Sequence, residues 1–334
     1  MRKTDFLKIL VLVIVLGFSA ITYLNRQNTI SKSRFLLDTI VDISVTASNK
    51  NCTKQNLEIL IDSTFSLISK YEHKFSYFNE ESKLWEINHS EKDSFPIDSD
   101  FYEILELSSK IYFETDSLYD ITIGCLTELW DFDKTHIPSL DSIKTAQKDI
   151  GFHRIKFSEN HLYKPKGIKL NLGSIAKGFI IDKAITYFKD NKVESAIINA
   201  GGDIRIFNSK KPLNVGIQNP RKQSEVIAVL KMQNSAVVTS GDYERYFEID
   251  GQIYHHIINP KTGFPAYNSI SVTVIAPTAT IADAYSTALF LMEPDEAIEL
   301  TNTIENIEAI IFYFEDDEIK DIRSDGSDEY LIKE

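Results

Sequence analysis

Apolar residues recur every three to four positions in several segments of the chain, the spacing that places them on one face of an α-helix. The longest such segment covers residues 54–75, where Leu57, Ile61, Phe65 and Ile68 mark the apolar face. Similar patterns predict helices at residues 101–113, 142–150, 277–290 and 294–303, a short helix after residue 80, and a helix opening at Gly173.

Elsewhere apolar and polar residues alternate, which is the period of a β-strand with one buried face. Predicted strands cover residues 35–45, 154–157, 161–164, 168–172, 194–199, 213–217, 225–232, 245–249, 252–258, 270–276, 307–314 and 318–323. Asp250-Gly251 favours a tight hairpin turn between two of them. Strands and helices do not follow a strict βαβ order, so we expect one α+β domain over residues 35–323, with mixed or antiparallel sheets flanked by helices.

The two ends of the chain differ from this domain. Arg2, Lys3 and Lys8 precede or border an uncharged run over residues 9–24, close to the roughly 20 apolar residues that cross a bilayer as a helix. We expect residues 1–25 to be a membrane anchor or uncleaved signal and residues 26–34 a tether. The domain would then lie on the periplasmic side of the inner membrane, with an acidic tail at residues 324–334. A cleavable signal peptide ending near Gly17-Phe18-Ser19 is the alternative.

Composition narrows the classes of function. The chain has 334 residues, 43% of them hydrophobic, and a formal net charge of −13. A nucleic-acid-binding protein would present a basic surface, so the charge argues against a nucleic-acid partner. Cys52 and Cys125 lie far apart without metal-type spacing, and a disulfide framework is not expected.

Polar groups crowd around the predicted 245–258 hairpin. They include Thr239-Ser240-Gly241-Asp242, the pair His255-His256, and Asn259-Pro260-Lys261-Thr262-Gly263. Each such group must find a partner or stay in water, which favours a functional site. Ordinary turn chemistry with one outward-facing histidine is the alternative explanation.

A second candidate is the helix opening at Gly173, which carries Lys177 in its first turn. Free backbone N–H groups and the helix dipole would favour a phosphate there, although the Walker pattern is missing. A glycine-initiated core helix would give the same pattern without a ligand.

A third candidate is the pair Asp283 and Thr287. Their spacing of four places both oxygens on one side of a helix, where they could bind Mg²⁺. Alternatively, Thr280 and Asp283 match a helix capping box, in which the aspartate serves only the helix end.

Taken together these segments resemble the FAD:protein FMN transferases, the ApbE-like flavin transferases, from about residue 35 to residue 292. The segments that carry the resemblance are Asn171-Leu172-Gly173-Ser174-Ile175-Ala176-Lys177-Gly178, Gly201-Gly202-Asp203-Ile204, Thr239-Ser240-Gly241-Asp242-Tyr243-Glu244-Arg245, His255-His256-Ile257-Ile258-Asn259-Pro260-Lys261-Thr262-Gly263, and Ala282-Asp283-Ala284 with Thr287.

The resemblance implies a T-fold-like domain that binds FAD with Mg²⁺, transfers FMN to a threonine hydroxyl of an acceptor protein through a phosphoester bond, and releases AMP. The implied acceptor is a subunit of a membrane redox pump or an exported flavoprotein. The implied metal ligands are Asp283, Thr287 and the backbone carbonyl of Ser174, and His256 is the implied base beside the catalytic Asp283. The positions implied to contact FAD are Leu37, Phe78, Leu118, Tyr119, Asp120, Asn171, Lys177, His256 and Ile257.

Three positions depart from the family pattern. Asn171 stands where an aspartate is usual, Asp38 where a glycine is usual, and Phe78 where a tyrosine is common. A FAD pyrophosphatase that yields free FMN and AMP, and a non-catalytic exported flavin-binding protein, are the alternatives to a transferase.

Overall fold

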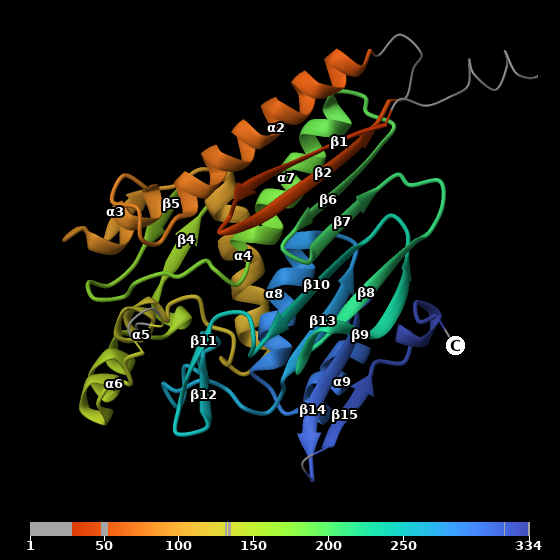
Figure 1. Cartoon of the computed structure of the whole chain (residues 1–334). Coiled ribbons are helices and arrows are strands. Elements are labelled where there is room, and N and C mark those ends of the chain that lie inside the picture. The colour runs from red at the N-terminus through yellow and green to blue at the C-terminus, as the bar shows by residue number, and fades with distance from the viewer. Residues whose placement is uncertain (1–28, 48–52, 131, 133–134, 317, 333–334) are drawn as a thin grey trace, which may run out of the picture.

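The computed structural model describes residues 29–47, 53–130, 132, 135–316 and 318–332. An 8-stranded sheet runs through its centre, and every neighbouring pair of strands is antiparallel (Figure 1). In spatial order its strands are β1 (Thr29–Leu36), β2 (Thr39–Thr46), β6 (Ser195–Ala200), β7 (Asp203–Phe207), β10 (Ala236–Gly241), β13 (Ser271–Ala276), β14 (Glu308–Glu315) and β15 (Glu318–Arg323).

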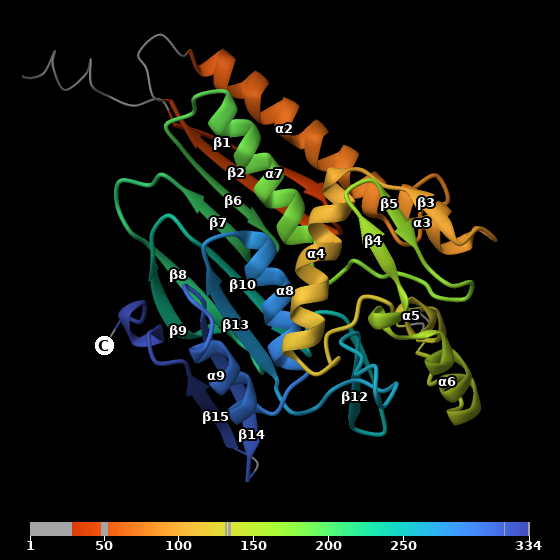
Figure 2. The ribbon, with the colours of Figure 1, turned by 180° about the vertical axis from the view of Figure 1, so that it is seen from behind.

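Helices cover one face of this sheet, as the view from behind shows (Figure 2). They are α2 (Lys54–Phe75), α4 (Ser99–Glu114), α7 (Ala176–Asp190), α8 (Ala279–Phe290) and α9 (Pro294–Asn302). Alternation along β10 explains the two layers: Val238 packs in the core beneath the helices, and Val237 packs in a second core on the opposite face. The hairpin of β8 (Leu213–Asn219) and β9 (Lys222–Met232) covers that second core.

Smaller elements lie at one end of the molecule (Figure 1). They are the sheet β3 (Ser94–Pro96), β5 (His161–Tyr163) and β4 (Lys156–Ser158), the hairpin β11 (Tyr246–Ile249) and β12 (Gln252–His255), the helices α3 (Lys83–His89), α5 (Gly124–Leu129) and α6 (Leu140–Ala146), and the 3-10 turns Gln147–Asp149 and Phe152–Arg154. A third 3-10 turn, Ser327–Glu329, follows β15. The α+β class is confirmed.

Two boundaries near the N-terminus were predicted wrongly. The expected strand at residues 35–45 is two strands, because Leu37 and Asp38 both adopt a φ of 56° and form the turn between β1 and β2. Such left-handed pairs suit two-residue hairpin turns, but neither residue type signals one. The expected tether therefore ends early, and Thr29 already pairs with Thr46.

Two further expectations also fail. Residues 168–172 are extended but form no strand of their own, because only Lys169 bridges to another residue, Ile123. The acidic tail was also expected to fray from Ser324 onward, but Ser324 is buried and its hydroxyl accepts the backbone N–H of Ala309 at 2.9 Å.

The expected membrane segment, residues 1–25, lies outside the described residues. Within the part of the chain that the structure describes, no helix has the length and apolar character needed to cross a membrane.

Candidate active site

Asp283 lies in α8 against the first turn of α7. Its Oδ2 atom accepts the backbone N–H of Gly178 at 2.8 Å, and its side chain is buried, with 5% exposed. A Cβ atom at Gly178 would lie 2.2 Å from the carbonyl oxygen of Ala279, so only glycine lets the two helices approach this closely. The alternative of a capping box between Thr280 and Asp283 is not observed, because Thr278 caps α8 and Thr280 donates its hydroxyl to Asp182.

Lys177 lies one residue before Gly178 and forms an ion pair with Asp203. The Nζ and Oδ2 atoms are 2.8 Å apart, and Asp203 is buried, with 2% exposed. Asp203 begins β7 directly after Gly201 and Gly202, whose φ angles of 65° and 105° make the turn from β6. This ion pair therefore joins the start of α7 to the centre of the sheet.

The two buried carboxyl groups, Asp203 and Asp283, share one nearby cation, Lys177, and the pKa of each is raised. Burial raises the pKa of Asp283 to about 7, and the negative Asp203 adds to this, while Lys177 and the Gly178 N–H oppose it. Burial also raises the pKa of Asp203, against the effect of Lys177. Burial alone would lower the pKa of Lys177, but Asp203 and Asp283 together hold it above its usual value.

Glu244 lies at the rim of this group. Desolvation by the surrounding protein raises the pKa of Glu244 to about 7. The negative Asp203 also raises this pKa, and the positive Lys177 lowers it. Its side chain is nevertheless exposed, so water screens it more than Asp283. The site thus places Asp203, Glu244 and Asp283 around one lysine.

Two hydroxyl-bearing residues flank Asp283. Thr287 lies one helical turn further along α8, and its Oγ1 atom is 3.4 Å from the Oγ atom of Ser240 on β10. Ser174 precedes α7 and donates its hydroxyl to the phenol oxygen of Tyr119 at 3.0 Å. Asp283 contributes to the raised pKa of the buried Tyr119, after burial itself. Tyr119 therefore lies near the Asp283 carboxylate, Ser174 is bonded to Tyr119, and Thr287 follows Asp283 by one helical turn.

The chemistry of this donor set fits Mg²⁺. The carboxylate of Asp283, the hydroxyl of Thr287 and the carbonyl of Ser174 are hard oxygen groups of the kind that Mg²⁺ prefers. Among the described residues, no three His, Cys, Asp or Glu side chains converge to form a complete metal cage. A metal here would therefore need hydroxyl, carbonyl, water or phosphate oxygens besides Asp283.

His256 follows β12, and the two histidines have different surroundings. The Nε2 atom of His255 lies 2.5 Å from the carbonyl oxygen of Ala266, which makes His255 a structural residue. His256 is half-buried, and within the described part of the chain its enclosed Nδ1 atom has no hydrogen-bond partner. Burial, together with the nearby His255, Arg245 and Lys177 side chains, lowers the pKa of His256 to about 4, while a hydrogen bond to the Arg245 backbone opposes this shift. At neutral pH the imidazole is uncharged and can accept a proton.

The contacts of four other residues expected to bind FAD are with residues outside the group of Lys177, Asp203 and Asp283. Leu37 lies in the β1–β2 turn, where its N–H donates to Glu72 at 2.7 Å. Phe78 is 69% exposed and packs edge-on against Tyr77. Leu118 is half-buried against the main core, and Ile257 is buried beside His256.

Asp120 and Asn171 both hold loops. The Asp120 carboxylate accepts the N–H and hydroxyl of Thr122, at 2.8 and 2.6 Å, and the N–H of Phe152 at 3.1 Å. Asn171 accepts the N–H of Gly173 and donates to the hydroxyl of Thr127, both at 2.8 Å. Asn171 thereby shapes the turn that carries Ser174, whereas Asp120 holds its own loop through Thr122 and joins it to the 3-10 turn at Phe152.

Asp203 and Glu244 were missed as site residues. Both lie in segments that carry the family resemblance, Gly201-Gly202-Asp203-Ile204 and Thr239-Ser240-Gly241-Asp242-Tyr243-Glu244-Arg245. The signal available in the sequence was an aspartate directly after two glycines. It did not identify the partner, because Lys177 lies in a distant part of the chain.

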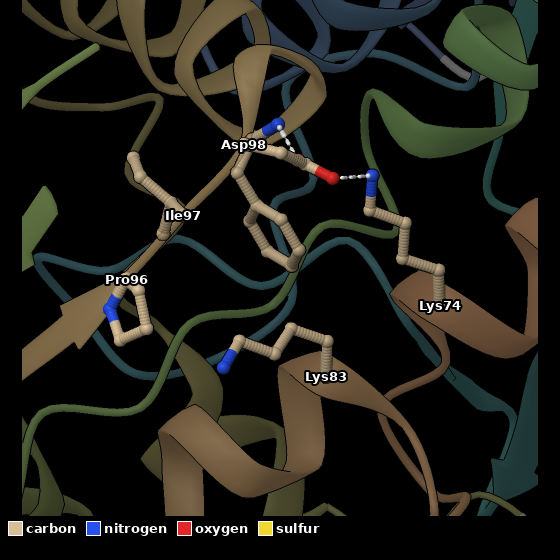
Figure 3. A pocket seen from close by; sticks show the side chains of 6 residues that line it. Lys74, Lys83, Pro96, Ile97 and Asp98 are labelled. Carbon is tan, nitrogen blue, oxygen red and sulfur yellow. Dashed lines mark hydrogen bonds and ion pairs between the residues drawn. The ribbon is translucent and has the colours of Figure 1, made fainter. Parts of the chain in front are cut away.

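Two pockets lie elsewhere on the protein. One, of about 350 Å³, is bordered by Lys74, Lys83 and Pro96, and Figure 3 shows Lys74 bonded to Asp98 at its edge. The other, of about 590 Å³, lies between α4, α7, β7 and the start of α8. Neither is lined by Lys177, His256 or Asp283.

Comparison with known proteins identifies the family of this chain. The ApbE family model matches residues 37–311. The FAD:protein FMN transferase of Treponema pallidum is 30% identical over 285 residues, 78% of each chain, and that of Escherichia coli K12 is 30% identical over 84% of this chain and 82% of its own. The crystal structure of the Thermotoga maritima ApbE protein superposes with a TM-score of 0.81 at 30% identity, covering 92% of this chain and all of that one. The chain belongs to the ApbE family.

Proposed function

We propose that this protein is a Mg²⁺-dependent FAD:protein FMN transferase that attaches FMN to a threonine hydroxyl of an acceptor protein and releases AMP. The observation that carries the proposal is the buried group of Lys177, Asp203 and Asp283 at the start of α7. A basic residue at a helix N-terminus suits a diphosphate, and the adjoining acid suits its metal. The transfer of FMN from FAD to a protein is also the activity in the names of its relatives.

The metal would be held by Asp283, Thr287 and the carbonyl of Ser174. When bound, Mg²⁺ neutralises charge on the diphosphate oxygens, which favours attack at phosphorus. Lys177 adds a positive charge from the protein side, and its side chain is 28% exposed, so a ligand can reach it.

His256 would accept the proton of the attacking hydroxyl. The threonine oxygen forms a bond to the phosphorus of the FMN half, the P–O bond to the AMP half breaks, and AMP leaves with that oxygen. A neutral imidazole is ready to take a proton at pH 7, in agreement with the lowered pKa of His256.

We extend the proposal to the location of the enzyme and the class of its acceptor protein. The apolar run at residues 9–24 would anchor the enzyme in the inner membrane, with its domain on the periplasmic side. A membrane redox-pump subunit or an exported flavoprotein would meet it there. Fractionation of cells that express the full chain, with protease treatment of spheroplasts, tests this placement.

Mass spectrometry of a candidate acceptor tests the activity. The acceptor is incubated with the purified protein, FAD and Mg²⁺, and one threonine is expected to gain the mass of FMN less one water while AMP appears in equal amount. A matched acceptor with that threonine changed to alanine should stay unmodified. Free FMN with AMP and no adduct would instead indicate a pyrophosphatase, and FAD that stays intact would indicate a binding protein.

A further inference from the structure

Lys177 needs something to hold it in place. It is the second residue of α7, where the positive end of the helix dipole disfavours a lysine. Its four-carbon side chain is also flexible. A lysine that is to meet a diphosphate in one position therefore requires a fixed partner.

The central sheet holds Asp203 in a fixed position. It pairs with Ala200 across the two-glycine turn, and the N–H of Gly201 donates to the carbonyl of Ile40 on β2 at 3.2 Å. A Cβ atom at Gly201 would lie 2.4 Å from the hydroxyl of Thr39, so β2 is closely packed on the turn. The carboxylate that faces Lys177 thus comes from a turn that is fixed by strand pairing and by close packing against β2.

The contact is close, but it leaves donor capacity on the lysine. Nζ and Oδ2 form an ion pair 2.8 Å apart. An ammonium group has three N–H donors, and this contact occupies only one of them. The N–H groups of Lys177 can point at a ligand while the ammonium stays beside Asp203.

We propose that Asp203 is a positioning residue for FMN transfer: it holds the ammonium of Lys177 where the diphosphate of FAD binds, without contacting FAD itself. The inference rests on the proposed function, because that function makes Lys177 the contact to the diphosphate. It predicts that Asp203 acts on FAD only through Lys177.

A double-mutant cycle tests this dependence. The variants are Asp203→Asn, Lys177→Met and the double variant, and the measurement is the dissociation constant of FAD in the presence of Mg²⁺, by quenching of flavin fluorescence. We expect Asp203→Asn to weaken FAD binding about 10-fold, within the range seen for coupled neighbours. The double variant should bind no more weakly than Lys177→Met alone, because Asp203 has nothing left to position.

Thermal unfolding supplies a second measurement. Lys177→Met leaves the buried Asp203 without its cation, which is strongly destabilising, so adding Asp203→Asn should raise the Tm again. Asp203→Glu keeps the charge and should retain FAD binding and kcat/KM within a few-fold. If Asp203→Asn does not fold, judged by circular dichroism, Asp203→Glu and the comparison of Lys177→Met with the double variant carry the test.

Asp100→Asn is the matched control. Asp100 is paired with Lys74 at 2.6 Å and Lys183 at 3.1 Å and lies outside the Lys177 group, so its loss should lower the Tm without changing FAD binding. Wild-type affinity in Asp203→Asn, additive effects in the cycle, or loss of FAD binding in folded Asp203→Glu would overturn the inference. A wild-type protein that neither binds FAD nor transfers FMN would overturn the proposed function instead.

Discussion

The backbone N–H of Gly178 donates to the carboxylate of Asp283 at 2.8 Å, and this bond ties the first turn of α7 to α8. It depends on the absence of a side chain at Gly178, because a Cβ atom there would also lie 2.8 Å from the Cβ atom of Asp283. The position of the expected metal ligand is therefore set by the packing of two helices.

Gly178→Ala is expected to separate α7 from α8. The added methyl group would meet the carbonyl of Ala279, and such overpacking typically costs about 1–3 kcal/mol. We expect a lower Tm and a large loss of FMN transfer, measured by calorimetry and by adduct formation. Gly216→Ala is the control, because its Cβ atom would meet only the end of the Val226 side chain, at 3.0 Å. Equal activity in both variants would contradict the role of the contact.

Asp283→Asn should remove the response to Mg²⁺. We expect Mg²⁺ at 100 times its dissociation constant to stabilise the wild-type protein by about 2.7 kcal/mol. The asparagine variant should show no Mg²⁺-dependent rise in Tm and at least about 100-fold slower transfer, since changes to metal sites commonly have such effects. The exposed Asp295 on α9 provides the control variant Asp295→Asn. A normal rise in Tm in Asp283→Asn would show that the ion binds elsewhere.

His256→Gln should slow transfer while FAD binding stays close to wild type. Loss of a general base typically costs about 10²–10⁴-fold in rate. Single-turnover kinetics gives the rate, and fluorescence quenching gives the affinity for FAD. If the rate stays within twofold of wild type, the proton has another acceptor.

The pKa of His256 also predicts a dependence of stability on pH. The folded pKa is about 4 and the unfolded one about 6.5, so between these values the unfolded chain binds more protons. The contribution is present above pH 6.5 and is lost as the pH falls toward 4, with a slope of up to about 1.4 kcal/mol per pH unit. The Tm difference between wild type and His256→Gln should therefore shrink or reverse from pH 7.5 to pH 4.5, and a difference that stays constant would refute the shift.

Asn171→Asp restores the acid that is usual in the family. Asn171 donates to the hydroxyl of Thr127 and accepts from Gly173, and an aspartate can keep both contacts if Thr127 becomes the donor. The added charge beside the site should lower the Mg²⁺ concentration needed for half-maximal FAD binding, by a few-fold, with little change in Tm. Titration of FAD binding with Mg²⁺ measures this, and a higher Mg²⁺ requirement would contradict it.

Sequence patterns predicted most helices and strands because burial imposes a period of 3.6 or 2 on apolar residues. They failed at Leu37 and Asp38, whose left-handed turn depends on pairing between β1 and β2 rather than on residue type. The sequence also could not decide whether Asp283 caps its own helix or serves another element. The structure decides this, since Asp283 accepts a bond from α7 while Thr278 caps α8.

By itself, the sequence determined the α+β class, the spacing of Asp283 and Thr287, and the family resemblance, because these depend on residues close together in the chain or on ordered motifs. Only the tertiary structure decided that Asp203 is the partner of Lys177 and that three acids surround that lysine. Local patterns carry no information on such pairs, because they form when strands and helices from distant segments pack together and exclude water from the charges between them.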